Sequence, residues 1–133
     1  MNTARRIYIN NDLDVVMARL QAREMAKQMG FGTADQARIS LAASELAKVL
    51  SWDTATPGEI VMADADKNGL QGLKVSCLVK LEYLPLEETQ KPPENIPAPS
   101  RNIAGACQLV DESTVELLDD KKARVTLMIL ICW

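Results

Sequence analysis

The sequence predicts a single α/β domain, with two amphipathic helices in its first half and paired strands in its second. Three observations support this prediction. The chain has 133 residues, of which 47% are apolar and 25% charged, as in an ordinary compact domain. Apolar residues recur at spacings of three and four up to about residue 51, and mostly at alternate positions from residue 73 onward. A chain of this length buries roughly two thirds of its unfolded surface, so residues 1–133 can form one core without disulfides.

The first half begins with a short β-favouring run and continues as two helices. Ile7-Tyr8-Ile9 is the strand candidate, and the Asn and Asp side chains that follow can cap a helix over 12–29. Gly30 ends this helix, because glycine adopts the left-handed conformation at low cost. Thr33-Ala34-Asp35-Gln36 has the form of a capping box and opens a second helix that runs to about residue 51. We expect the two helices to be antiparallel neighbours.

The second half contains two pairs of strands. Residues 59–63 and 73–81 form the first pair, and 64–72 is the turn between them. Residues 114–118 and 124–132 form a hairpin. Because the last strand is almost entirely apolar, we expect it to be central and covered on both faces.

A proline-rich segment separates these two pairs. Five of the six prolines fall within 84–101, together with several glutamates, and this composition sustains neither helical nor strand hydrogen bonds. We therefore expect a loop or lid at 84–101, followed by a short helix over about 103–110. The segment is too short to separate two domains.

Composition and charge exclude several classes of function. Fifteen basic and eighteen acidic residues give a net charge of −3, which offers no basic field for nucleic acid. No apolar run approaches the roughly 18 residues that cross a bilayer, and no signal-like stretch opens the chain, so we expect a cytoplasmic protein that binds no membrane. The chain has no histidine, which excludes Ser-His-Asp hydrolysis, Cys-His chemistry and most zinc sites. The three cysteines are expected to be small core residues.

Two local features invite a chemical interpretation. Asp64-Ala65-Asp66-Lys67-Asn68-Gly69 matches the first half of a calcium loop, but Val75 stands where the bidentate glutamate belongs. A solvated hairpin turn is therefore the preferred interpretation, and we expect no metal site. Glu45 lies at the edge of the apolar stripe of the second helix, where its carboxylate either reaches solvent or serves a pocket.

A family resemblance is carried chiefly by the second helix, in Ala42-Ala43-Ser44-Glu45-Leu46-Ala47-Lys48. Further matching residues lie at 18–19, 22–27, 30–31, 35–39, 58–60, 72–73, 108–112 and 124–127. With them the chain resembles the anti-sigma-factor serine kinases of the RsbT/RsbW type, which belong to the GHKL (Bergerat-fold) ATPase superfamily. The resemblance implies a two-layer α/β sandwich with a mixed, mainly antiparallel sheet and helices on one face. It also implies that the proline-rich segment replaces the ATP lid.

The sequence departs from the family pattern at all three nucleotide-binding boxes. The family carries an asparagine four residues after the position of Glu45, and its amide oxygen helps to hold the magnesium of ATP; Val49 occupies that position here. The second box, Asp-x-Gly-x-Gly, is replaced at 82–86 by a stretch without glycine. Ser100 and Asn102 stand where the third box has two glycines. The resemblance therefore implies that Glu45 is a residual catalytic base and that no ATP or Mg²⁺ is expected.

The preferred functional hypothesis is a degenerate regulator that binds proteins in a bacterial partner-switching pathway. The resemblance implies a STAS-domain antagonist, a phosphatase or a sigma factor as partner, and it leaves a homodimer open. Four cations on the first two helices form a candidate docking face: Arg19, Arg23, Lys27 and Arg38. One alternative is an active serine kinase that uses ATP and Mg²⁺ to phosphorylate a STAS-domain antagonist. The other is a scaffold domain unrelated to sigma-factor control.

Overall fold

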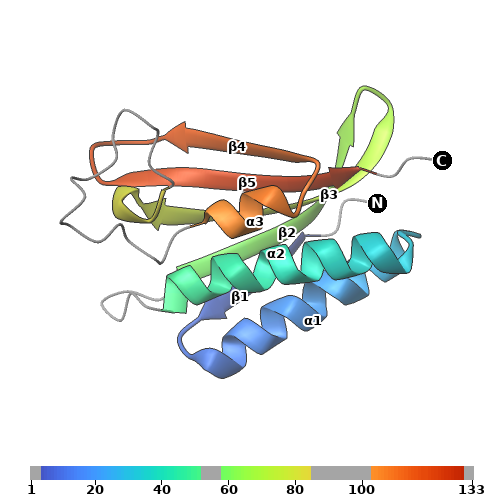
Figure 1. Cartoon of the computed structure of the whole chain (residues 1–133), viewed down its shortest axis with the longest axis horizontal. Coiled ribbons are helices and arrows are strands. Elements are labelled where there is room, and N and C mark those ends of the chain that lie inside the picture. Colours follow the sequence, from blue (N-terminus) through green and yellow to red (C-terminus); the bar gives the residue numbers. More distant parts are fainter. Residues whose placement is uncertain (1–3, 52–57, 85–102, 131–133) are drawn as a thin grey trace.

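The computed structural model describes residues 4–51, 58–84 and 103–130 and has two layers. One layer is a five-stranded sheet, and the other consists of helices that cover one face of that sheet (Figure 1). The strand order is β1-β2-β3-β5-β4, and every pairing is antiparallel. The predicted α/β sandwich with helices on one face is confirmed, and the described sheet contains no parallel pair.

Helices α1 (Asp12–Gln28) and α2 (Thr33–Ser51) run antiparallel across the sheet (Figure 1). Both agree with the predicted ranges to within one residue. The side chain of Asn11 caps α1 by accepting a hydrogen bond from the backbone N–H of Asp14 at 3.1 Å, and Gly30 has a φ of +93° beyond the helix end. The predicted capping box is wrong, because Thr33 already lies inside α2 and the Gln36 side-chain amide donates to the Phe31 carbonyl at 2.8 Å.

The five strands alternate residues that face the helices with residues that face away from them. Their bounds are β1 Ala4–Ile9, β2 Gly58–Lys67, β3 Leu70–Lys80, β4 Glu112–Leu117 and β5 Lys122–Leu130. The side that faces α1 and α2 supplies most of the strand residues in the core, among them Ile60, Val75 and Leu127, each with an exposed fraction of 0%. This alternation is the period of two that the sequence indicates.

The turn between β2 and β3 is a tight two-residue turn. Asn68 and Gly69 both have positive φ, at +54° and +84°, as an Asn-Gly hairpin of type I′ requires. Asp66 Oδ1 accepts a hydrogen bond from the Gly69 N–H at 3.1 Å, so this carboxylate closes the turn. The predicted hairpin is confirmed, but most of the 64–72 range assigned to the turn belongs to the two strands.

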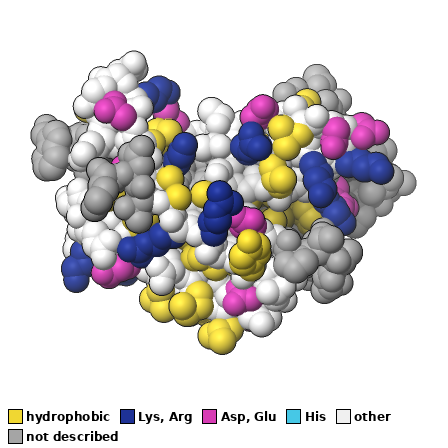
Figure 2. Space-filling model, turned by 180° about the vertical axis from the view of Figure 1, so that it is seen from behind, with side chains coloured by type: hydrophobic (Ala, Val, Ile, Leu, Met, Phe, Trp, Pro, Cys, Tyr) yellow, Lys and Arg dark blue, Asp and Glu magenta, His cyan; other side chains and the backbone are white. Residues whose placement is uncertain are grey.

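Strand β5 is central in the sheet, but only one of its faces is buried. Ala123, Val125 and Ile129 face the helices, whereas Arg124 and Met128 lie on the other face, which none of the described helices covers. Figure 2 shows this second face with Lys and Arg, Asp and Glu, and hydrophobic side chains interspersed. The expectation that both faces of the last strand are covered is therefore wrong. The apolar residues of β5 that point away from the helices lie on a partly exposed surface of mixed character.

Two short elements connect β3 to β4 on the helical side. They are the 3₁₀ turn η1 (Leu81–Tyr83) and helix α3 (Ala104–Gln108), and the Ile103 N–H donates to the Tyr83 carbonyl at 3.1 Å. Except for Leu84, the proline-rich segment 84–101 lies outside the described residues, as does Cys132. Among the described residues, no helix combines the length and the apolar composition that a bilayer-spanning segment requires.

Candidate functional site

A cavity of about 340 Å³ opens at the end of the sheet where α2 ends and β2 begins. The β2–β3 ladder stops at the pair Ile60–Cys77, so the last three residues of β3 continue without a partner from β2. Gly58 closes the wall at this point, because a Cβ placed there would lie 2.8 Å from the Leu50 Cβ. The cavity therefore forms where β3 extends past the start of β2, and the glycine at position 58 lets β2 pack closely against Leu50 at its edge.

The floor of the cavity is apolar. Val49 and Leu50 from the last turn of α2 have exposed fractions of 2% and 6%, and Cys77 and Val79 from β3 are similarly buried. Burial raises the pKa of the Cys77 thiol to about 12, so the thiol stays protonated and acts as a small apolar group. The prediction of a core role for this cysteine is confirmed, and Cys107 is half-buried.

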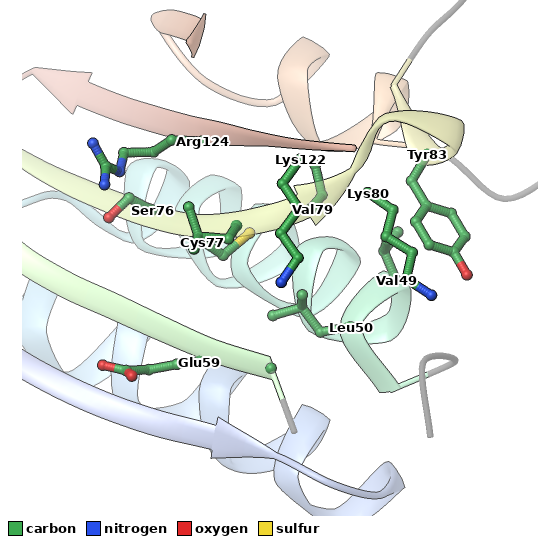
Figure 3. Close-up of a pocket in the computed structure, with 12 residues that line it drawn as sticks. Val49, Leu50, Glu59, Ser76, Cys77, Val79, Lys80, Tyr83, Lys122 and Arg124 are labelled. Carbon is green, nitrogen blue, oxygen red and sulfur yellow. The ribbon is translucent and has the colours of Figure 1, made fainter. Parts of the chain in front are cut away.

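The walls of the cavity carry positive charge. Lys80 and Lys122 extend from the strands toward Val49 and Leu50, and the ring of Tyr83 lies at the same side (Figure 3). Within the described ranges the Lys122 ammonium makes no hydrogen bond or ion pair. The third cation, Arg124, lies 3.3 Å from Glu116 Oε2. This arrangement can attract an anion.

Oxygen ligands for a metal are scarce in the same cavity. Among the described residues that line it, Glu59 supplies the one carboxylate, whose Oε1 lies 2.6 Å from Arg6 Nη1, and Ser76 and Tyr83 contribute hydroxyls. In the part of the chain that the structure describes, no three Asp, Glu, Cys or His residues stand close enough to hold a metal ion. Val49, where the resemblance implies a magnesium-holding asparagine, lines the cavity with a side chain that contains only carbon.

Glu45, the candidate catalytic base, lies one turn before Val49 but does not line the cavity. Its Oε1 accepts a hydrogen bond from Lys48 Nζ at 3.1 Å, and 39% of its side chain is exposed. In this structure Glu45 is thus a paired residue at the helix edge. Ser100 and Asn102 lie outside the described residues, so the structure does not place the third box.

Arg38 differs from the other three candidate docking cations because it is bonded within the fold. Its guanidinium donates to the Leu109 carbonyl at 2.9 Å and to Asp35 and Asp111 at 2.8 Å each. Desolvation raises the pKa of Asp111, but hydrogen bonds from Arg38 and from the Leu130 N–H outweigh it, so the net pKa lies below its usual range. Arg38 therefore joins α2 to the segment that leads into β4.

Arg19, Arg23 and Lys27 are exposed along α1, as a docking face requires. None of the three makes a hydrogen bond or ion pair with any residue of the described ranges. The structure therefore separates the predicted group of four into one internal clamp and three solvent-facing cations.

Sequence reasoning missed Lys80, Tyr83 and Lys122 as residues of the site. They lie on η1 and at two strand ends, and only the pairing of β3 with β5 brings them together, through the pair Lys80–Lys122. No motif or periodicity marks them.

The sheet with helices on one face and a cavity at the end of α2 defines a two-layer α/β sandwich. No protein-family model matches the chain. Over 75 residues it is 41% identical to the serine/threonine-protein kinase RsbT of Bacillus subtilis, and this stretch is 56% of each protein. The chain thus spans about half the length of that relative.

A solved structure shares the fold. It contains the RsbU and RsbW domains of Rv1364c from Mycobacterium tuberculosis, and it matches 98% of this chain and 32% of its own with a TM-score of 0.62. The sequence identity is 18%, so this likeness shows the fold alone. Together the two findings confirm the resemblance to the RsbT/RsbW type of serine kinase.

Proposed function

We propose that this protein is a regulator of the partner-switching type, which works in the cytoplasm by binding another protein and does not bind ATP. The likeness to RsbT supports the regulatory class. The observation that best supports the absence of ATP binding is the side chain of Val49, which contains only carbon and lies beside Leu50 in the cavity floor with an exposed fraction of 2%. Mg²⁺ requires near-octahedral oxygen coordination and gives up its water reluctantly, and a valine offers it no ligand.

A titration with Mg-ATP tests this proposal. A ligand at 100 times its Kd stabilises the folded state by about 2.7 kcal/mol, which raises the Tm of a domain of this size by roughly 10 °C. We expect no shift in Tm up to millimolar Mg-ATP. A saturable rise in Tm that Glu45→Ala or Lys122→Ala abolishes would overturn the proposal.

The partner is sought among the classes that the resemblance implies, namely a STAS-domain antagonist, a phosphatase or a sigma factor. Each candidate from the host is mixed with this protein, and binding is measured by calorimetry in the absence of nucleotide. We expect one of them to bind with a micromolar or lower Kd. The proposal fails if none binds without nucleotide and one binds once Mg-ATP is added.

One observation favours a second function, an active ATP-dependent serine kinase that phosphorylates a STAS-domain antagonist. Lys80 and Lys122 place positive charge on the walls of the cavity, where a triphosphate would be attracted. Transfer of ³²P from [γ-³²P]ATP to a serine of a STAS domain would establish this alternative.

A further inference from the structure

Helix α1 presents a second apolar stripe on its solvent side. Leu13, Val16, Met17 and Leu20 follow the i, i+3, i+4, i+7 spacing, and their exposed fractions range from 40% to 68%. At about 100° per residue, this stripe lies opposite the buried face of the helix. That buried face consists of Val15, Ala18, Ala22, Met25 and Ala26. Helix α1 is therefore apolar on two opposite sides, of which the fold uses one.

A row of cations borders the exposed stripe. Arg19, Arg23 and Lys27 follow one another at intervals of four residues, so each lies one turn from the next. Like charges at this spacing destabilise a helix by about 0.2–0.5 kcal/mol per pair. Within the described residues these cations make no hydrogen bond or ion pair, so the folded chain gains no stability from such bonds at Arg19, Arg23 and Lys27.

We propose that this surface of α1 binds an acidic amphipathic helix of a partner protein. The surface, called here the α1 outer face, consists of Leu13, Val16, Met17, Leu20, Arg19, Arg23 and Lys27. The proposal rests on the proposed protein-binding function and adds to it the docking surface and the chemistry of the partner. In Figure 2, hydrophobic side chains gather at the lower edge of the molecule, at the level where α1 lies in Figure 1.

The spacing of the apolar residues on the α1 outer face indicates that the partner binds there through a helix. An apolar row at spacings of three and four forms a straight ridge over two turns, into whose flanking grooves the side chains of a second helix pack. The charges specify an acidic partner, because carboxylates beside that helix's apolar stripe would neutralise Arg19, Arg23 and Lys27. A second copy of α1 packed in parallel would instead bring three more cations to the same interface, whereas an antiparallel copy would also bring Asp12 and Asp14. The crosslinking experiment below separates a second copy of this chain from an acidic partner helix.

Peptide binding tests the chemistry directly. The probe is a fluorescein-labelled 18-residue helix with leucine at spacings of three and four and glutamate on both flanks; the comparison peptide carries lysine in place of glutamate. We expect the acidic peptide to bind at least 10-fold more tightly than the basic one. Arg19→Glu combined with Arg23→Glu should remove this preference, and the matched double variant Lys74→Glu, Lys121→Glu should keep it. Equal binding of both peptides, or an unchanged preference in the α1 variant, would overturn the proposal.

Photo-crosslinking tests the surface with the native partner. The photoreactive residue p-benzoylphenylalanine replaces Val16 or, as a control, Leu70, because the two have nearly equal exposed fractions of 40% and 39%. In host extract we expect a crosslink from position 16 but not from position 70, to a segment that mass spectrometry identifies as an acidic amphipathic helix. The proposal is contradicted if position 16 crosslinks to a second copy of this chain or to a segment that is not an acidic amphipathic helix. It is also contradicted if position 16 gives no crosslink.

The two proposals fail in different ways. If charge reversal on α1 leaves the binding of the partner found by calorimetry unchanged, the docking surface is wrong and the protein-binding function stands. If the wild-type protein binds Mg-ATP and binds partners only then, the proposed function is wrong whatever α1 does.

Discussion

The cavity at the end of α2 and the outer face of α1 differ in how far the fold accounts for their residues. In the cavity, the buried side chains of Val49 and Leu50 contribute to the core, and Gly58 is required by the close approach of Leu50. On α1, apolar and cationic side chains face solvent, and no described residue pairs with the cations. The residues of the cavity floor are accounted for by their contribution to the stability of the core. The exposed apolar and cationic residues of α1 make no such contribution, which indicates that they bind a partner.

The largest expected difference between buried and exposed apolar residues comes from a matched pair of leucines. Leu46 in α2 is fully buried, and Leu20 on α1 has an exposed fraction of 50%. We expect Leu46→Ala to lower the free energy of unfolding by about 2–5 kcal/mol, and Leu20→Ala to change it by less than about 0.5 kcal/mol. Urea denaturation measures both values. A large loss with Leu20→Ala would mean that the α1 stripe is structural.

Val49→Asn tests whether the cavity floor behaves as part of the apolar core. The substitution introduces the amide that the resemblance implies at this position, but it places the amide in an apolar, 2% exposed site. We expect a loss of about 1–3 kcal/mol in unfolding free energy, because the buried amide lacks hydrogen-bond partners. Val49→Ile, which stays apolar, is the control and should cost less. If Val49→Asn is as stable as the wild type, the floor is wetter than the structure indicates.

The paired cation Arg38 and the unpaired cation Arg19 offer a second contrast. Arg38→Ala should cost about 1–3 kcal/mol, because it removes three hydrogen bonds, two of which join α2 to the residues before β4. Arg19→Ala should leave the unfolding free energy within about 0.5 kcal/mol of the wild-type value. Equal losses would contradict the division of the four cations into a clamp and a docking row.

The pH dependence of stability checks the clamp independently. The pKa of Asp111 is lowered in the folded state, so its contribution is present above the ordinary carboxyl pKa near 4 and is lost as the pH falls through the lowered value. We therefore expect Asp111→Asn to lower the Tm at pH 7, with the difference from wild type disappearing as the pH falls through the lowered pKa of Asp111. If the Tm difference between wild type and Asp111→Asn stays the same at acid pH, the effect comes from the packing of the side chain and not from its charge.

The smallest effect concerns the charge row on α1. Removing the middle cation with Arg23→Ala relieves two like-charge contacts and should stabilise the protein by a few tenths of a kcal/mol at low salt. The gain should shrink at 1 M NaCl, where screening shortens the Debye length to about 3 Å. A loss of stability on Arg23→Ala would show that this cation has a partner in the folded chain.

Local signals predicted much of the fold. The boundaries of α1 followed from helical spacing, from the Asn and Asp side chains before it and from the stop at Gly30, which act within a few residues of chain. The range of α2 was also predicted correctly, although the capping box from which its start was predicted is wrong. The turn range 64–72 was too long because alternation weakens near the hairpin, although Asn68-Gly69 alone is the signature of a two-residue turn. The burial of β5 on both faces was a wrong prediction, because apolar composition does not tell how many layers cover a sheet.

The candidate site could be predicted only in part. Val49 was identified through the resemblance, and its burial agrees with an apolar role. Lys80 and Lys122 escaped because they are 42 positions apart and meet only through the register of β3 and β5. Arg38 was grouped with the α1 cations because charge on a helix surface does not reveal a bond to Leu109 or Asp111 far along the chain.

Calorimetric titration with the non-hydrolysable analogue adenylyl-imidodiphosphate and Mg²⁺ tests most directly whether the cavity at the end of α2 has lost the nucleotide. We predict that a protein that still binds its partner gives no saturable heat up to millimolar concentrations of the analogue. A 1:1 isotherm that requires Mg²⁺ and is lost in Lys122→Ala would contradict it.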